Sequence, residues 1–444
     1  MKISVTILSA LLLCSFNLTN TELKKSLDVF IGSEIDNLQA FYTSIHQNPE
    51  ISLEEKETSK KLANELKKLG FEVTENFGGY GVVGIYKNGD GPQILYRTDM
   101  DALPVQEKTD LDYASTKMMV NPWNNNNESF TMHACGHDMH MTVWTGVAQA
   151  MVAMKDQWNG TLMLIGQPAE EIGQGSRMML ENGLYEKFGV PDFGLGMHSS
   201  PTIAAGKVGL GQGWSMAAVE SVDINVYGFG AHGASPHMSV DPVVLASMIV
   251  MELQTIVSRN MKPIDDAVIT VGSMHGGTKH NIIPDEVKLQ LTIRTYTQEV
   301  RDLIHKRIKE ICDGTAMAAG LPKDKWPKVT KLDQFTPANY NSPNLVTKII
   351  NSSKKAIGDA NVEDAEPQMV GEDFSRFGQT EHNVPTVLMW LGTVPDSRMK
   401  AMRDEGYNLP ALHSPFYYPD PRPSIETGVK VGTTALIDLF NSPN

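Results

Sequence analysis

Short apolar runs that end in acidic residues or histidine are the feature that most constrains how this chain can fold. "QILYR" leads into Asp99 and Asp101, "TLMLIGQP" leads into Glu170 and Glu171, and "FGLGM" leads into His198. Runs of this kind, separated by stretches with helical periodicity, indicate buried strands that alternate with helices. We therefore expect an α/β fold, in which a three-layer α/β/α sandwich surrounds a largely parallel sheet.

The pattern changes between about residues 213 and 328. This stretch reads as strand, helix, strand, strand, helix, with a closing strand near "PKVTKLD", which is the order of a ferredoxin-like unit. We expect 213–328 to be a small α+β domain for dimerisation or for covering a site. Residues 21–212 and 329–444 would then form the two parts of the larger domain.

The N-terminus has the pattern of an export signal. "MKISVTILSALLLCSFNLTN" places one lysine before about a dozen mostly apolar positions, which are too few to cross a bilayer. We expect residues 1–20 to be a signal peptide, cleaved near residues 16–22. The mature protein would be periplasmic or secreted, without stable membrane association. A buried N-terminal helix or a membrane anchor is the alternative interpretation.

The charge of the chain argues against nucleic acid as a partner. The formal net charge is -14, and the sequence has no long Lys/Arg run that could neutralise phosphates. Beyond the leader only Cys135 and Cys312 remain, which are too few for a disulfide framework.

One short segment concentrates the residues that bind metals. "TMHACGHDMHMT", residues 131–142, holds three histidines, a cysteine and an aspartate. In parallel sheets the carboxyl ends of the strands gather several loops over one crevice, so this segment is expected to meet the acidic strand ends. Imidazole, carboxylate and thiolate groups in one dry crevice need a cation to compensate them, and their mixture suits Zn, Mn, Co or Ni. Cys135 could bridge two such ions.

The adjacent carboxylates Glu170 and Glu171 suggest a division of labour. Neighbouring side chains leave a turn in different directions, so that one can bind metal while the other faces a water molecule. A carboxylate beside the attacking water can accept its proton and pass it to a leaving nitrogen. We assign this general-base role to Glu170. Asp99 and Asp101 are expected to orient the histidine ligands rather than to bind the ions.

Together these segments resemble a known group, the aminoacylase and carboxypeptidase metallopeptidase superfamily. Within it the chain is most similar to the N-acyl-amino-acid amidohydrolases, a branch that includes hippurate and auxin-conjugate hydrolases. The resemblance rests on eight ordered motifs: "RTDMDALPVQE", "MHACGHDMH", "GQPAEEIGQGSRMMLENGL", "GMHSSP", "GAHGASPHMSVDPV", "HNIIPDEV", "GEDFSRF" and "LHSPFY". It covers nearly everything after the leader.

The resemblance implies a role for each matching residue. The metal ligands would be Cys135, His137, Glu171, His198 and His413, holding two divalent ions, manganese or zinc, with cobalt or nickel as alternatives. His232 would stabilise the oxyanion as a second catalytic residue, and Asn281 would approach the substrate, both from the opposite subunit of a homodimer formed through the inserted domain. Arg294 would bind the substrate carboxylate.

These residues imply a hydrolase that cleaves the amide of an N-acyl-amino acid into a carboxylic acid and a free amino acid. A carboxypeptidase or dipeptidase of the same superfamily, acting on short peptides, shares the catalytic parts and is the first alternative. A metal-free hydrolase with Cys135 as nucleophile is a second, and a non-catalytic binding protein a third.

Other polar residues near these motifs have simpler interpretations. For His133 and His140 we expect packing or support of the ligands, since the resemblance assigns them no metal. Glu372 and Asp373 fit the N-terminus of a helix, where the helix dipole favours acidic side chains, and are pocket candidates only.

Overall fold

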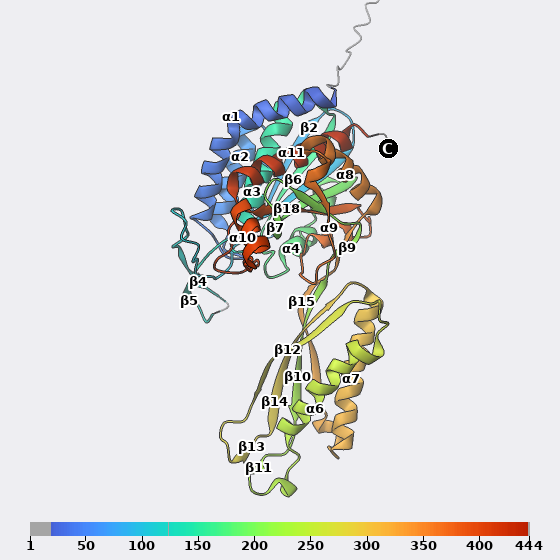
Figure 1. Ribbon diagram of the computed structural model, residues 1–444. Coiled ribbons are helices and arrows are strands. Elements are labelled where there is room, and N and C mark those ends of the chain that lie inside the picture. The colour runs from blue at the N-terminus through green and yellow to red at the C-terminus, as the bar shows by residue number, and fades with distance from the viewer. Residues whose placement is uncertain (1–18, 123, 443–444) are drawn as a thin grey trace, which may run out of the picture.

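The structure, a computed structural model, describes residues 19–122 and 124–442 and has two parts (Figure 1). One part is built around an eight-stranded sheet and the other around a four-stranded sheet. Residues 1–18 of the expected signal peptide lie outside the described residues. The first helix, α1 (Asn20–His46), begins directly after them with a capping box between Thr19 and Glu22.

The larger sheet is mainly parallel in its centre. Strand β3 pairs in parallel with both β6 and β7, and β18 pairs in parallel with β7, whereas β2 is antiparallel to β1 and β6. This arrangement confirms the α/β sandwich. From one edge to the other the strands are β1 (Glu72–Thr74), β2 (Val82–Asn88), β6 (Gly160–Gln167), β3 (Gln93–Asp99), β7 (Phe193–Ala204), β18 (Thr386–Val394), β8 (Val208–Leu210) and β17 (Val362–Asp364).

Two helical layers cover this sheet because its strands are apolar on both faces. In β3, Ile94 and Tyr96 pack into one core, while Leu95 between them packs into the other. The first core is covered by α1, α2 (Lys56–Lys68), α3 (His137–Ala153), α8 (Pro343–Ile357) and α11 (Pro421–Phe440). The second is covered by the shorter helices α4 (Gly175–Glu181), α5 (Leu184–Phe188) and α9 (Ser375–Gly378).

The smaller part has the predicted ferredoxin-like order. Its sheet runs β12-β14-β10-β15 and is antiparallel throughout, with both helices packed on one face around their own core. The expected insert was 213–328, whereas this sheet extends from Ala218 to Thr336. In chain order the elements are β10 (Ala218–Tyr227), α6 (Pro242–Thr255), β12 (Ala267–Gly276), β14 (Glu286–Thr295), α7 (Gln298–Ala318) and β15 (Lys328–Thr336).

The chain passes between the two parts twice, and the two crossings lie side by side. Strand β9 (Gly213–Met216) pairs antiparallel with β16 (Asn339–Asn341), just before β10 and just after β15. The Trp214 ring packs on the rings of Tyr296 and Tyr340 at this point, with centroids 6.1 and 4.9 Å apart. The inserted domain is therefore carried on one two-stranded ribbon (Figure 1).

Three further features project from these layers. A hairpin of β4 (Met118–Asn121) and β5 (Asn127–Phe130) extends from the larger part, which also carries α10 (Asp396–Glu405) (Figure 1). The far end of the inserted domain carries β11 (Ala231–His232) and β13 (Ile282–Ile283), which pair with each other. The tip also holds the short turn of helix at Pro236–Met238.

Candidate metal centre

Five side chains from four segments of the chain meet at the carboxyl ends of the central strands. The ligand atoms of Cys135, His137 and His198 all lie within 4.8 Å of one another, and those of Cys135, Glu171 and His413 form a second group by the same limit. Cys135 belongs to both groups. This geometry brings together all five of the expected metal ligands, and it suits two ions that share the cysteine sulfur.

A left-handed glycine allows the cysteine loop to reach this position. Gly136, at the start of α3, has φ +82°, and a Cβ atom there would lie 2.8 Å from the Ser199 hydroxyl oxygen. The loop can therefore pack tightly against β7, between Cys135 and His137. The same close approach places the first turn of α3 beneath the ligand groups.

Backbone carbonyls fix the direction of two histidine rings. His137 Nδ1 lies 2.8 Å from the Asp101 carbonyl oxygen, and His198 Nδ1 lies 2.9 Å from the Ser199 carbonyl oxygen. Because each Nδ1 must donate to its carbonyl, each Nε2 keeps a lone pair that points into the site. His198 Nε2 lies 3.6 Å from Cys135 Sγ.

Asp99 was expected to orient a metal-binding histidine, but its hydrogen bonds go to His140 and Arg97. Its Oδ1 accepts from His140 Nδ1 at 2.7 Å, and its Oδ2 accepts from Arg97 at 2.8 Å. His140 Nε2 accepts the Ser199 backbone N–H at 2.7 Å, so both nitrogens of His140 are used and neither is free to bind metal. The expectation that His140 supports the site without binding an ion agrees with these contacts.

The unpaired atoms of the site fit a cation. His137 Nε2 and Glu171 Oε1 are both buried, and neither has a hydrogen-bond partner among the described residues. Buried polar atoms are seldom left unsatisfied, and here they belong to two ligand groups that face each other across 3.7 Å. One sulfur, three imidazoles and carboxylate oxygen form a donor set that divalent transition metals accept.

Electrostatics also indicate that a positive charge is needed here. Burial raises the pKa of the Cys135 thiol well above its usual value, and Glu171 and Glu170 raise it further. Burial likewise raises the pKa of Glu171 to about 8, although His137 opposes the shift. Burial and its acidic neighbour Glu372 hold the pKa of Glu170 well above its usual value. A divalent cation would relieve the crowding of all these acidic groups.

Glu170 lies beside the two ligand groups that contain Cys135 but belongs to neither of them. Its Oε2 is 3.8 Å from His137 Nε2, and its side chain lines the same cavity as Cys135 and His413. This carboxylate lies next to the ligands and is open to the cavity, which is the position that a general base requires.

A buried arginine beneath the centre could not be recognised from the sequence. Arg97 donates to Asp99 and Glu372 at 2.8 Å and contacts Asp373 at 3.3 Å. Ser176 and Gln167 also donate to Asp373. The helix-dipole interpretation of Glu372 and Asp373 therefore missed their main partner, which lies about 275 residues away in the chain. The sequence signal for these two acidic residues was "GEDF", because it belongs to the motifs that the chain shares with the superfamily.

A cavity of about 590 Å³ separates the metal ligands from the inserted domain. Its floor includes Cys135, Glu171 and His413, and its opposite wall is the helix-free face of the small sheet. On that wall Arg294 sits between Val219 and Val268 on the neighbouring strands. Methionine and other apolar side chains line much of the remainder, namely Met216, Met369, Val370, Ile172 and Leu412.

Arg294 is an unusual wall residue because its charge is not compensated. It is half-buried, which lowers its pKa, and it makes no ion pair or side-chain hydrogen bond within the described part of the chain. A guanidinium that faces a cavity without a partner is suited to bind an anionic group of a ligand. The predicted contact with a substrate carboxylate is compatible with this placement.

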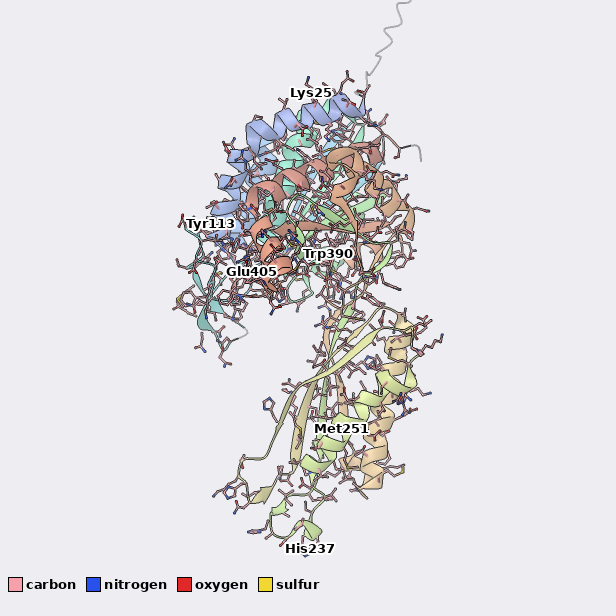
Figure 2. The ribbon with its side chains drawn as sticks, in the orientation of Figure 1. Lys25, Tyr113, His237, Met251, Trp390 and Glu405 are labelled. Carbon is pink, nitrogen blue, oxygen red and sulfur yellow. The ribbon has the colours of Figure 1, made fainter. Side chains whose placement is uncertain are left out.

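Two other predicted residues are not brought to the centre by a single chain. His232, in β11, and Asn281, beside β13, are exposed at the far tip of the inserted domain. Figure 2 shows how far that tip extends: His237 marks it, while Trp390, whose ring packs on His198, marks the metal ligands. Neither side chain lines the cavity within this single chain.

Comparisons with known proteins agree with this geometry. Residues 95–414 match the model of peptidase family M20/M25/M40. The chain is 38% identical to hippurate hydrolase of Campylobacter jejuni over 335 residues, covering 75% of this chain and 82% of that protein. It is 36% identical to N-acetyldiaminopimelate deacetylase of Leuconostoc citreum, covering 80% and 88%.

A solved structure extends the similarity to the whole fold. A dinuclear metal-binding peptidase of the M20 family from Bacillus subtilis superimposes with a TM-score of 0.70 at 27% identity, covering 92% of this chain and 98% of that one.

Proposed function

The chain belongs to peptidase family M20/M25/M40 and is a metal-dependent amidohydrolase, and from this premise we propose that its substrates are N-acyl-amino acids. It would release a carboxylic acid and a free amino acid. The observation that carries the proposal is the cavity with Cys135 common to two ligand groups on one side and the uncompensated Arg294 on the other. An N-acyl-amino acid offers an amide to the first and a carboxylate to the second.

The ions are proposed to be two manganese or zinc ions per subunit, with cobalt or nickel as alternatives. His137 and His198 would hold one ion, Glu171 and His413 the other, and Cys135 both. When bound, such ions polarise the amide carbonyl and make a water molecule more acidic.

Glu170 is the proposed general base. Its carboxylate would accept a proton from the attacking water and deliver that proton to the departing nitrogen, which would leave as the amine of the free amino acid. Glu372 and Glu171 surround it with negative charge, which favours proton uptake. Asp101 and Asp99 would keep the neighbouring rings in place through the contacts described above.

Arg294 is proposed to hold the substrate carboxylate with its guanidinium, which would orient the amide toward the ligand side of the cavity. The apolar wall would then receive the acyl group. A carboxypeptidase or dipeptidase activity uses the same parts, and the C. jejuni and L. citreum relatives, which are named for N-acyl substrates, favour the first assignment.

A homodimer through the inserted domain is proposed to complete the site. The outer face of α6 exposes Val244, Met248 and Met251, with exposed fractions of 53, 49 and 71%, and β12 is an open edge of the small sheet. The helical stretch Pro242–Asn260 is apolar enough to cross a membrane by composition, but its other face packs in the small domain's core. A second copy could cover this surface and bring its own His232 and Asn281 to the cavity.

Export to the periplasm or the exterior is proposed from the first 20 residues. The mature chain would then begin close to the start of α1. It would work on small molecules in solution, without nucleic acid and without stable attachment to a membrane.

A metal-free cysteine hydrolase is disfavoured by the surroundings of Cys135. A nucleophilic thiol needs a lowered pKa, whereas burial and two carboxylates raise the pKa of this one. Treatment with a chelator separates the alternatives, because a thiol enzyme would keep its activity and a metal enzyme would lose it until the metal is restored.

The test combines metal analysis, a substrate panel and one substitution. Purified protein should contain divalent metal and hydrolyse N-acetyl- or N-benzoyl-amino acids faster than dipeptides. Glu170→Gln should lower kcat by about 10²- to 10⁴-fold while the metal content stays that of the wild type. The exposed Glu186→Gln is the matched control and should be fully active. Near-normal turnover by Glu170→Gln would refute the base role, and no turnover of any substrate by metal-loaded wild type would indicate a binding protein.

A further inference from the structure

Glu55 is a buried carboxylate whose place in the fold has no explanation so far. Its side chain is fully buried at the start of α2, and no cation pairs with it among the residues that the structure covers. Oε1 accepts the backbone N–H of Ala169 at 2.7 Å, while Oε2 is buried without a partner in the same set of residues. A buried carboxylate without a cation is costly, so a specific role is to be expected.

Capping of α2 does not account for this carboxylate. Glu55 occupies the N-cap position, but its side chain makes no capping hydrogen bond. Glu50 fulfils that role instead, since it accepts the backbone N–H groups of Glu57 at 2.9 Å and Thr58 at 2.8 Å.

The partner of Glu55 is a strained residue directly before the proposed base. Ala169 has φ +51°, in the left-handed region that residues with a Cβ atom avoid, and Glu170 follows it. The Ala169 carbonyl accepts the N–H groups of Gln174 and Gly175, both at 3.1 Å. The Ala169 residue is thus held on both sides, and the Glu55 carboxylate supplies the contact on its N–H side.

A second contact from the same segment reaches the other side of Glu170. The Ser52 hydroxyl donates to Asp101 Oδ2 at 2.6 Å, and that same oxygen accepts the backbone N–H of Glu171 at 3.0 Å. The segment 52–55 therefore contacts, directly or through Asp101, the backbone N–H groups on both sides of the base.

We propose that Glu55 is a positioning residue for Glu170, acting through its hydrogen bond to Ala169, with Ser52 in a supporting role. The inference rests on the proposed function of Glu170. It assigns a part in the reaction to a segment that precedes residues 95–414, the stretch that matches the family model. Glu55 itself does not line the cavity and belongs to neither of the ligand groups proposed for the ions.

A matched pair of substitutions separates the hydrogen bond from the acidity of the carboxyl group. Glu55→Gln keeps an acceptor oxygen at the same distance, and its kcat should stay within about threefold of the wild type. Glu55→Met fills the same volume without an acceptor, and its kcat should fall by roughly 10- to 100-fold because the base is displaced, while KM changes little. Glu54→Ala, on the exposed neighbour, is the control and should be unaffected.

Replacement of the strained alanine gives a readout that a purely structural role would not produce. Glycine adopts the left-handed conformation without strain, so Ala169→Gly added to Glu55→Met should recover kcat severalfold over Glu55→Met alone. If Glu55 only supports the local packing, glycine would add a further loss. Ser52→Ala should lower kcat by a few-fold with unchanged metal content.

The outcomes are distinct from those that test the base. Wild-type kcat in Glu55→Met, an equal loss in Glu55→Gln and Glu55→Met, or no recovery with Ala169→Gly would each overturn the positioning role. If Glu55→Met does not fold, Ser52→Ala decides, and wild-type kcat in that variant overturns the proposal. An active Glu170→Gln would overturn the proposed function together with this inference, whereas an inactive Glu170→Gln beside a normal Glu55→Met would overturn the inference alone.

Discussion

Cys135 is the residue on which the arrangement of the centre depends, because its sulfur is common to both ligand groups. His198 approaches it from β7 and Glu171 from the turn after β6. In the absence of a cation, burial and the carboxylates of Glu171 and Glu170 raise the pKa of the thiol and would keep the sulfur protonated. Metal binding and thiol ionisation should therefore occur together.

We predict that Cys135→Ser lowers the amount of metal bound per subunit, because a hydroxyl is a weaker bridging ligand than a thiolate. Metal analysis after dialysis measures the effect. Cys312→Ser is the control, since that cysteine is buried in α7 of the inserted domain, and its metal content should equal that of the wild type. Full metal content in Cys135→Ser would contradict a bridging role.

Arg294 should contribute to substrate binding rather than to turnover. We predict that Arg294→Met raises KM for an N-acyl-amino acid by roughly 10- to 100-fold, the loss expected for a charge-assisted hydrogen bond. The same variant should change KM little for a substrate whose carboxylate is converted to an amide. Arg259→Met, an exposed arginine of the same domain, serves as control. Equal effects on both substrates would exclude the carboxylate contact.

At this scale the sequence could identify the ligands and nearby supports such as His140, but not the supports that lie far away in the chain. Cys135, His137 and Glu171 stand at the ends of apolar runs or in a motif, so their chemistry and spacing were visible. Arg97 and Glu55 act through partners about 275 and 114 residues away, and such contacts exist only once the sheet has formed. His137 is also oriented by a backbone carbonyl, which any residue at position 101 would provide.

Among the elements, β10 is the one that links the small sheet to the crossing between the two parts. Near its start Glu220 accepts from Arg301 and from His305 of α7, at 2.9 and 2.7 Å. Burial alone would raise the pKa of Glu220, but His305 and Arg301 lower it to about 2. The ionised form of Glu220 is therefore bound more tightly in the folded domain than in the unfolded chain.

The sign of this shift gives a pH-dependent prediction. A lowered pKa stabilises the fold above pH 4.5, and the stabilisation is lost as the pH falls from about 4.5 toward 2. Glu220→Gln should lower the free energy of unfolding by about 2 to 3 kcal/mol at pH 7, and the difference should shrink below about pH 4.5 and nearly close at about pH 2. Thermal unfolding at both pH values measures it. The control is Asp223→Asn, which removes a surface pair with Lys288 and should lower the free energy of unfolding by less than about 1 kcal/mol. A loss of stability in Glu220→Gln that is the same at pH 7 and in acid would refute the linkage.

Element prediction succeeded where the periodicity was strong. The alternation in "AVESVDINVYG" became β10, with Val222 and Ile224 in the small core. The expected end of the insert, residue 328, falls on the first residue of β15, and that strand continues to Thr336. The ribbon of β9 and β16 was not expected, since its strands have only four and three residues and lie far apart in the sequence.

For the whole molecule, the distance between the tip and the metal ligands makes the proposed dimer testable. We predict that Met251→Asp on α6, labelled in Figure 2, yields monomers with little activity, because a buried aspartate would oppose association. Sedimentation gives the mass and a turnover assay the activity. Val29→Asp, an equally exposed position on α1, should remain dimeric and active. An active monomer would show that one chain suffices.

Complementation tests whether the tip acts across the interface. Glu170→Gln and His232→Ala should each be inactive alone, yet a mixed dimer would contain one site with an intact base and an intact histidine from its neighbour. Random exchange of subunits would restore roughly a quarter of the wild-type sites. No recovery after verified exchange would mean that His232 acts in its own chain or not at all.

The single ribbon between the two parts has a consequence for how the reaction ends. Under the proposed function, the substrate is fastened at one end by Arg294, on the inserted domain, and at the other by the ligand side of the larger domain. The scissile amide is then the covalent link between the parts of the substrate that the two domains bind. Its hydrolysis breaks that link, so the chemical step itself would allow the two domains to separate and release both products.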